Sequence, residues 1–180
     1  MEDTDIQFRK VLDGCRSVFE VKLQDYGASW RILRTPSLTD QIFIKACRIR
    51  SIEEKGVALV NEGAVGEFVA IVNYGIVGLI QLALGHADTE DITPAEAMEL
   101  YDKYSAEAFE LMKRKNHDYN EAWRSMRVSS YVDFILTKVN RTKQIENNRG
   151  ATLASEGIDA NYMDMINYAV FALIKLDFNI

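Results

Sequence analysis

The chain is short of the residues that break helices and of those that build metal or redox sites. Its 2 prolines and 10 glycines among 180 residues are too few for an all-β domain cut by frequent turns, so long helices are expected. The 2 cysteines, Cys15 and Cys47, have no CxxC spacing and no histidine nearby, so neither a zinc site nor a redox pair is indicated. We expect free thiols in a cytoplasmic protein.

Further absences limit the classes of function. Acidic residues outnumber basic ones by 27 to 21, and a net charge of −6 argues against binding of polymeric nucleic acid. The N-terminus lacks the apolar core of a signal peptide, and polar residues interrupt the most apolar stretch, residues 68–84, which we interpret as a buried helix. Glycine-rich phosphate loops and the pattern of a catalytic triad are also absent. We therefore expect no membrane partner and no covalent hydrolase chemistry.

What the chain does contain is an internal repeat. Residues 22–55 align without gaps on residues 115–148, with 13 identities in 34 positions. After one inserted residue the similarity continues at a shift of 94 residues as far as residue 176. We interpret the chain as a tandem duplication, in which one domain, residues 1–180, contains repeats at residues 5–87 and 93–180.

Each repeat is expected to form three helices. Thr93 to Glu96 have the pattern of a capping box with proline at the first helical position. Ser37 and Ser130, each followed at the third position by aspartate, are the expected N-caps of the second helices. Short connections between six helices predict an all-α helical bundle. The expected helices span approximately residues 5–23, 37–55, 65–84, 94–115, 130–148 and 160–176.

The second helices carry charge on the side that should face the core. On a helical wheel, several charged residues fall within the arc of the shared apolar positions or at its edge. A buried unpaired charge is costly, so each must meet an opposite charge, a metal or a ligand. One interpretation is a structural ion pair, such as Lys45 with Asp25 or Glu67, and the other is a cavity that holds an anion and a divalent cation. The charged residues concerned are Lys45, Arg48 and Glu53, and in the second copy Lys138, Arg141 and Glu146.

A second repeated unit follows the first helix of each copy. Its aromatic residues either close the end of the bundle or stack on a base while the basic residues face phosphate, and the spacing does not separate these alternatives. The repeated residues are Lys22, Asp25, Tyr26, Trp30 and Arg31, and then Lys115, Asp118, Tyr119, Trp123 and Arg124.

On the third helices, three positions spaced by three residues share one face. They hold Glu67, Ala70 and Asn73 in the first copy and Asn161, Asp164 and Asn167 in the second. Oxygen ligands directed toward Glu53 or Glu146 would suit Mg²⁺. Alternatively, the two aligned asparagines satisfy buried polar groups between helices.

The combination of Lys-x-x-Asp-Tyr and Trp with Lys-x-x-Arg and Asp-x-x-Asn-Tyr-Ala resembles the nucleotide-modification-associated domain family. Through it, the chain resembles the all-α nucleoside triphosphate pyrophosphatases of the MazG-like and dimeric dUTPase-like group. The resemblance covers residues 5–176 and implies Mg²⁺-dependent hydrolysis of a nucleoside triphosphate in a helical bundle that commonly forms homodimers. The chain departs from the pyrophosphatase pattern where Lys45-x-x-Arg48 and Lys138-x-x-Arg141 replace a Glu-x-x-Glu pair.

These observations lead to a hypothesis of a Mg²⁺-dependent pyrophosphatase that acts on or binds a nucleotide, with a nucleotide-binding module without turnover or a structural helical protein as alternatives. We expect one functional site per chain, in the second copy. Glu67 and Asp164 are the expected catalytic residues. The expected Mg²⁺ ligands are Glu53, Glu67, Glu146 and Asp164. The expected nucleotide contacts are Lys22, Asp25, Tyr26, Trp30, Lys45, Arg48, Asn73, Lys115, Asp118, Tyr119, Trp123, Lys138, Arg141 and Asn167.

Overall fold

The computed structural model describes residues 3–56, 63–153 and 156–178. These residues form six α-helices and two short 3-10 helices and include no strand, which confirms the predicted all-α fold. The elements are α1 (Thr4–Tyr26), η1 (Ser29–Ile32), α2 (Thr35–Lys55), α3 (Ala64–Leu84), α4 (Pro94–Tyr119), η2 (Ala122–Ser125), α5 (Val128–Asn147) and α6 (Ile158–Lys175).

The capping signals predicted one helix start correctly and missed two others. At the start of α4, the Thr93 hydroxyl accepts a hydrogen bond from the Glu96 amide at 3.2 Å, and the Thr93 amide donates to the Glu96 carboxylate at 2.7 Å. In contrast, α2 follows Arg34 and α5 follows Arg127, so Ser37 and Ser130 lie inside the first turns. In α2 this earlier start is favoured by the proline in its first turn, because its fixed φ is already helical.

The first helix of each copy is longer than expected. The last turns of α1 and α4 reach Tyr26 and Tyr119, and the tryptophan of each corner lies on the 3-10 helix that follows. The repeated corner unit is therefore divided between a helix end and a 3-10 turn.

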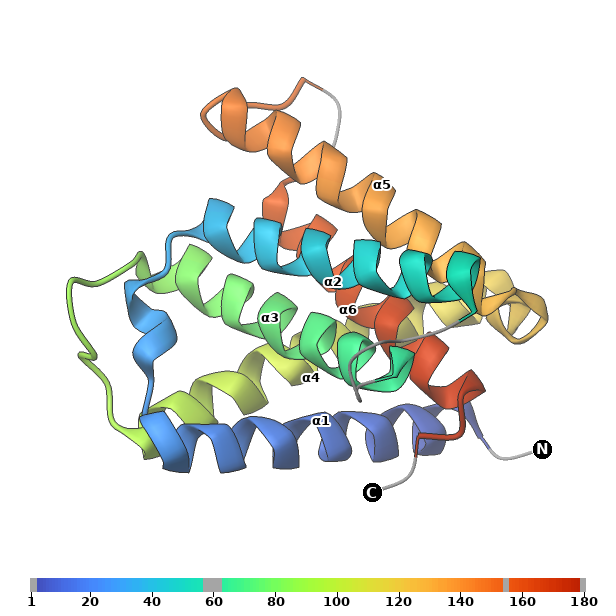
Figure 1. Ribbon diagram of the computed structural model, residues 1–180, viewed down its shortest axis with the longest axis horizontal. Coiled ribbons are helices and arrows are strands. Elements are labelled where there is room, and N and C mark those ends of the chain that lie inside the picture. Colours follow the sequence, from blue (N-terminus) through green and yellow to red (C-terminus); the bar gives the residue numbers. More distant parts are fainter. Residues whose placement is uncertain (1–2, 57–62, 154–155, 179–180) are drawn as a thin grey trace.

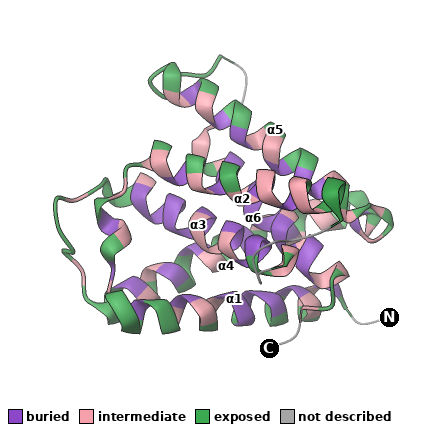
Figure 2. Cartoon of the chain, viewed as in Figure 1, coloured by how far each residue is buried: buried purple, intermediate pink, exposed green. Residues whose placement is uncertain are grey.

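The helices pack as three pairs (Figure 1), with α3 and α6 at the centre, α2 and α5 on one side, and α1 and α4 on the other. The central pair is antiparallel and close. A Cβ atom added to Gly75 would lie 2.6 Å from Ile166, and one added to Gly78 would lie 2.9 Å from the Tyr162 ring. Small residues on α3 therefore permit this contact, and both central helices are largely buried (Figure 2).

Two ion pairs between α2 and α5 reveal the symmetry of the duplication. Asp40 contacts Lys143 at 2.8 Å, and Asp133 contacts Arg50. A shift of 93 residues converts one pair into the other, so exchanging the halves reproduces the interface. The two halves are thus related by an approximate twofold axis.

The apolar helix predicted at residues 68–84 is the core helix α3. Within the described part of the chain it alone is long and apolar enough to cross a membrane, and 67% of its apolar window is buried inside the protein. One cluster of buried apolar side chains includes residues from both halves. The proposed repeat boundaries and cytoplasmic location stay predictions.

Candidate functional site

Each half buries one acidic residue from its central helix between two cations. In the first half, Glu67 contacts the Lys45 ammonium at 3.3 Å and also the Arg48 guanidinium, and its side chain is 1% exposed. In the second half, Asp164 is 5% exposed and contacts the ammonium groups of Lys115 at 2.5 Å and Lys138 at 2.7 Å. The predicted ion pair of Lys45 with Glu67 is confirmed.

The two aligned asparagines differ in how completely they are bonded. The side-chain amides of Asn73 and Asn167 donate to the carbonyl oxygens of Cys15 and Ala108, which are equivalent residues of α1 and α4. The oxygen of Asn73 also accepts from the Tyr101 hydroxyl at 2.7 Å. In the other half, the position equivalent to Tyr101 is Phe8, which has no hydroxyl to donate. The side-chain oxygen of Asn167 is buried without a hydrogen-bond partner among the residues described. Both asparagines satisfy buried carbonyls, as one interpretation predicted.

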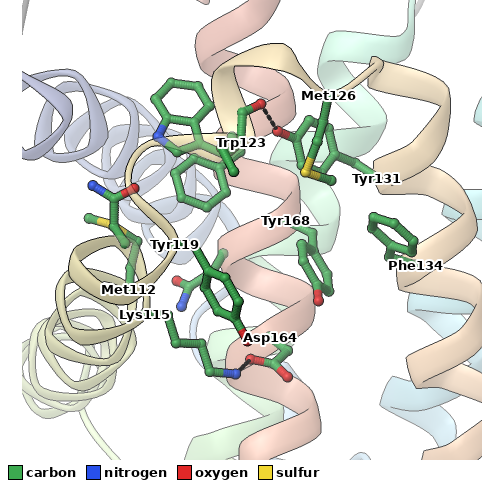
Figure 3. Close-up of a pocket in the computed structure, with 13 residues that line it drawn as sticks. Met112, Lys115, Tyr119, Trp123, Met126, Tyr131, Phe134, Asp164 and Tyr168 are labelled. Carbon is green, nitrogen blue, oxygen red and sulfur yellow. Dashed lines mark hydrogen bonds and ion pairs between the residues drawn. The ribbon is translucent and has the colours of Figure 1, made fainter.

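A pocket of about 290 Å³ opens beside Asp164 (Figure 3). It lies among α4, η2, α5 and α6, at the corner unit of the second half. Its volume is at the lower end of ligand pockets, which typically measure about 300–1,000 Å³. The lining residues are Met112, Lys115, Asn116, Tyr119, Ala122, Trp123, Met126, Tyr131, Phe134, Asp164, Asn167, Tyr168 and Phe171.

Aromatic rings form much of the pocket wall and support one another. The rings of Trp123 and Phe171 stack with centroids 4.5 Å apart, and the Tyr131 hydroxyl donates to the Trp123 carbonyl at 2.6 Å (Figure 3). Tyr119, at the end of α4, is 70% exposed. Because the other rings of the wall pack on one another while Tyr119 is largely exposed, Tyr119 is the ring most available to stack on a planar ligand.

Two of the lining residues carry polar atoms that are themselves buried. The Trp123 indole N–H and the Asn167 side-chain oxygen belong to buried residues and lack hydrogen-bond partners within the described ranges. Buried polar groups normally bind water or ligand when the protein supplies no partner. Burial, together with the negative charge of Asp164, raises the pKa of Tyr168, whose neutral hydroxyl therefore remains a donor at neutral pH.

The pocket brings together five residues predicted from the sequence, Lys115, Tyr119, Trp123, Asp164 and Asn167. Lys138 reaches the same carboxylate from α5. Sequence reasoning missed the remaining aromatic wall, because most of its rings are not repeated in the first copy. At the aligned positions the first copy has Leu38, Gln41 and Val77 where the second has Tyr131, Phe134 and Phe171.

Three charged positions on α2 and α5 differ from the prediction. Glu53 and Arg141 are exposed rather than inward. Glu146 accepts a hydrogen bond from Thr39 of the other half at 2.8 Å instead of facing Asp164. It lies eight residues beyond Lys138, which corresponds to about 12 Å along a helix, too far to join the cluster around Asp164.

The arginines of the corner units have structural partners. Arg31 is buried, forms a two-point ion pair with Asp91, and also donates to the Gln81 side chain and the Gly85 carbonyl. Arg124 contacts Glu121 and donates to Gln7 and Thr4 of α1. These arginines therefore fix the 3-10 turns and the contact between the halves.

The other corner residues do not enter the pocket. Lys22, Asp25, Tyr26 and Asp118 are exposed, and Trp30 packs on Phe19 with ring centroids 6.2 Å apart. Among the residues described, no three or more acidic, histidine or cysteine side chains form a group that could hold a metal ion. Lysine and arginine neutralise the two buried acids instead, so this donor set does not fit a resident Mg²⁺.

Comparison with known proteins identifies both halves of the chain with one family. Residues 22–82 and 115–176 each match the nucleotide modification associated domain 1 family. No curated protein and no solved structure matches the chain. The two matches coincide with the repeat found in the sequence, and they support a coarse link to nucleotide-related function. The chain therefore belongs to the nucleotide modification associated domain 1 family, as a tandem duplication.

Proposed function

We propose that the protein binds a nucleotide in the aromatic pocket of its second half. The observation that carries this proposal is the pocket itself, in which aromatic rings adjoin a buried carboxylate held by Lys115 and Lys138. Aromatic faces stack on bases without regard to sequence, and lysine ammonium groups donate to phosphate oxygens. Family membership supports the choice of a nucleotide over other ring-bearing anions.

In the proposed complex, the base stacks on Tyr119 at the pocket mouth and its polar edge meets the buried Asn167 oxygen. That oxygen requires a donor, such as an amino or imide N–H of a base, because the protein gives it none among the described residues. The phosphate lies toward the lysines. The pocket volume suits one nucleotide and not a folded polynucleotide.

The proposal is tested by a matched pair of tyrosine substitutions. Tyr119 and Tyr26 are equivalent and are 70% and 57% exposed, so replacing either by alanine should cost little stability. Calorimetric titration with the common nucleosides and their 5′-phosphates should show binding that Tyr119→Ala weakens about fivefold or more, since base stacking contributes about 1–3 kcal/mol. Tyr26→Ala should bind like wild type. Equal losses in both variants, or no binding by wild type, would contradict the proposal.

Hydrolysis of a nucleoside triphosphate is the second candidate, and the observation that favours it is the carboxylate of Asp164 in the pocket wall. Both of its oxygens contact ammonium groups, so its charge is already neutralised. A pyrophosphate-release assay across the common nucleoside triphosphates, with Mg²⁺ present, separates the candidates. Binding without turnover predicts no release above the protein-free rate, whereas release that Asp164→Asn abolishes would establish the hydrolase.

A further inference from the structure

Asp164 connects two lysines that come from different helices. Lys115 lies in the last turns of α4, and Lys138 lies in the middle of α5. The Oδ1 atom of Asp164 contacts the Lys115 ammonium group at 2.5 Å (Figure 3). The Oδ2 atom contacts the Lys138 ammonium group at 2.7 Å. We refer to Lys115 and Lys138 as the lysine pair. The buried carboxylate fixes where the pair lies at the edge of the pocket.

The lysine pair keeps unused hydrogen-bonding capacity. Each ammonium group has three N–H donors, and its contact with Asp164 requires only one of them. The side chains of Lys115 and Lys138 are 41% and 19% exposed, so solvent, and hence a ligand, can reach them. A phosphate could therefore bind to the pair while Asp164 stays in place.

The net charge of this cluster is small. Two ammonium groups and one carboxylate leave a single positive charge. Of the residues that the structure describes, only Lys115 and Asp164 are charged members of the pocket lining. Asp118, which follows three residues after Lys115, is exposed and adds negative charge near the end of α4. The cluster can thus offset about one negative charge of a phosphate group, and the described residues supply no further cation to the pocket lining.

We infer that this site prefers nucleoside monophosphates over the unphosphorylated nucleoside and over the di- and triphosphates. The inference rests on the proposed function and names the ligand class for the same pocket. A phosphate monoester carries about −1.5 to −2 charges at pH 7 and offers three acceptor oxygens to the lysine pair. Each further phosphate group adds negative charge that the pocket lining does not neutralise. Asp164 acts as a positioning residue that holds the pair together.

Calorimetric titration of the full chain at fixed ionic strength tests this preference. The probes are each common ribo- and deoxyribonucleoside and its 5′-mono-, di- and triphosphate, without and with Mg²⁺. For the base that binds best, we expect the monophosphate to bind about tenfold or more tightly than the nucleoside, as hydrogen bonds to charged groups contribute about 1.5–3 kcal/mol. The di- and triphosphates should bind no more tightly than the monophosphate.

The lysine pair is tested by Lys115→Met and Lys138→Met. Each change leaves the other lysine on Asp164, so the fold should persist, and circular dichroism checks that it does. Both variants should reduce the advantage of the monophosphate over the nucleoside, measured as the ratio of the two affinities within each variant. Lys22→Met, at the exposed position equivalent to Lys115, is the matched control and should behave like wild type.

The outcomes separate this inference from the proposed function. If nucleosides bind as tightly as monophosphates, or if triphosphates bind more tightly with or without Mg²⁺, the inference is wrong and the proposed function stands. An unchanged monophosphate advantage in both lysine variants would also overturn it. If neither nucleosides nor nucleotides bind, the proposed function itself fails.

Discussion

The two halves of the molecule have equivalent helices but bury their acids one helical turn apart. In α3 the acid is Glu67 and the next position of the same face is Ala70. In α6 the order is reversed, with Asn161 followed by Asp164. Three residues correspond to about 4.5 Å along the helix axis. The two halves therefore differ in two ways. The buried carboxylate lies about one helical turn further along the central helix in the second half, and the aromatic pocket lies beside it there.

The different position of the buried acid changes which lysine and arginine side chains contact it. Glu67 contacts two cations from α2, Lys45 and Arg48, and the α1 lysine at the corner remains exposed. Asp164 contacts one lysine from α5 and one from α4, at the pocket edge. The first arrangement joins two helices of the core, whereas the second joins three helices at the edge of the aromatic pocket.

The largest expected effect on stability comes from removing both cationic partners of either buried acid. Replacing both Lys45 and Arg48 by methionine, or both Lys115 and Lys138, should cost about 3–5 kcal/mol, because a buried carboxylate loses its partners. For a chain of this length the melting temperature should fall by roughly 6–20 °C. The loss should be larger in the first half, since Asp164 borders a pocket that can admit water.

Neutralising the stranded acid is the control for both double variants. Adding Glu67→Gln in the first half, or Asp164→Asn in the second, should restore most of the lost stability in thermal unfolding. Failure of either rescue would mean that the lost packing of the long side chains, and not the stranded charge, caused the effect.

A smaller effect distinguishes the two aligned asparagines. Tyr101→Phe removes the donor from the partly buried Asn73 oxygen and should cost about 1 kcal/mol in the free energy of unfolding. Phe8→Tyr places a hydroxyl at the equivalent position of the other half, where it should donate to Asn167. This variant should keep its stability but bind nucleoside more weakly, because the acceptor is then occupied. Unchanged binding would remove Asn167 from the proposed base contacts.

The smallest effect concerns the equivalent residues Glu146 and Glu53. Burial, only partly offset by the Thr39 hydrogen bond, raises the pKa of Glu146. The folded state therefore binds this proton more tightly than the unfolded state, so stability falls as pH rises from about 4 through the raised pKa. Glu146→Gln should raise the melting temperature at pH 7 and make no difference below about pH 4. Glu53→Gln should change it less, since Glu53 is exposed. An equal rise in melting temperature in both variants would contradict the difference in burial between Glu146 and Glu53.

The sequence was sufficient to predict the helices and the duplication, because apolar periodicity, the capping box at Thr93 and the repeated identities are local signals. It predicted that Asp164, Lys115 and Lys138 belong to the candidate site, from three separate patterns. Lys138 falls on the inward face of the second helix, Lys115 belongs to the repeated corner unit, and Asp164 lies on the polar face of the third helix. It did not predict the aromatic wall, because Tyr131, Phe134 and Phe171 occur in one copy only.

Contacts between the halves were beyond sequence reasoning. The bond from Thr39 to Glu146 depends on how α2 crosses α5, and the contacts of Arg124 with α1 depend on how the corner of one half meets the other. Such contacts follow from packing of the apolar faces and leave no pattern within either copy.

We propose that the nucleotide site lies in the second half alone. Electron density from crystals soaked with the best-binding nucleoside 5′-monophosphate would show where the ligand binds. We expect one ligand per chain, with its base beside Tyr119 and its phosphate on Lys115 and Lys138. Density beside Tyr26 and Lys22, or in both halves, would show that the proposed assignment is wrong.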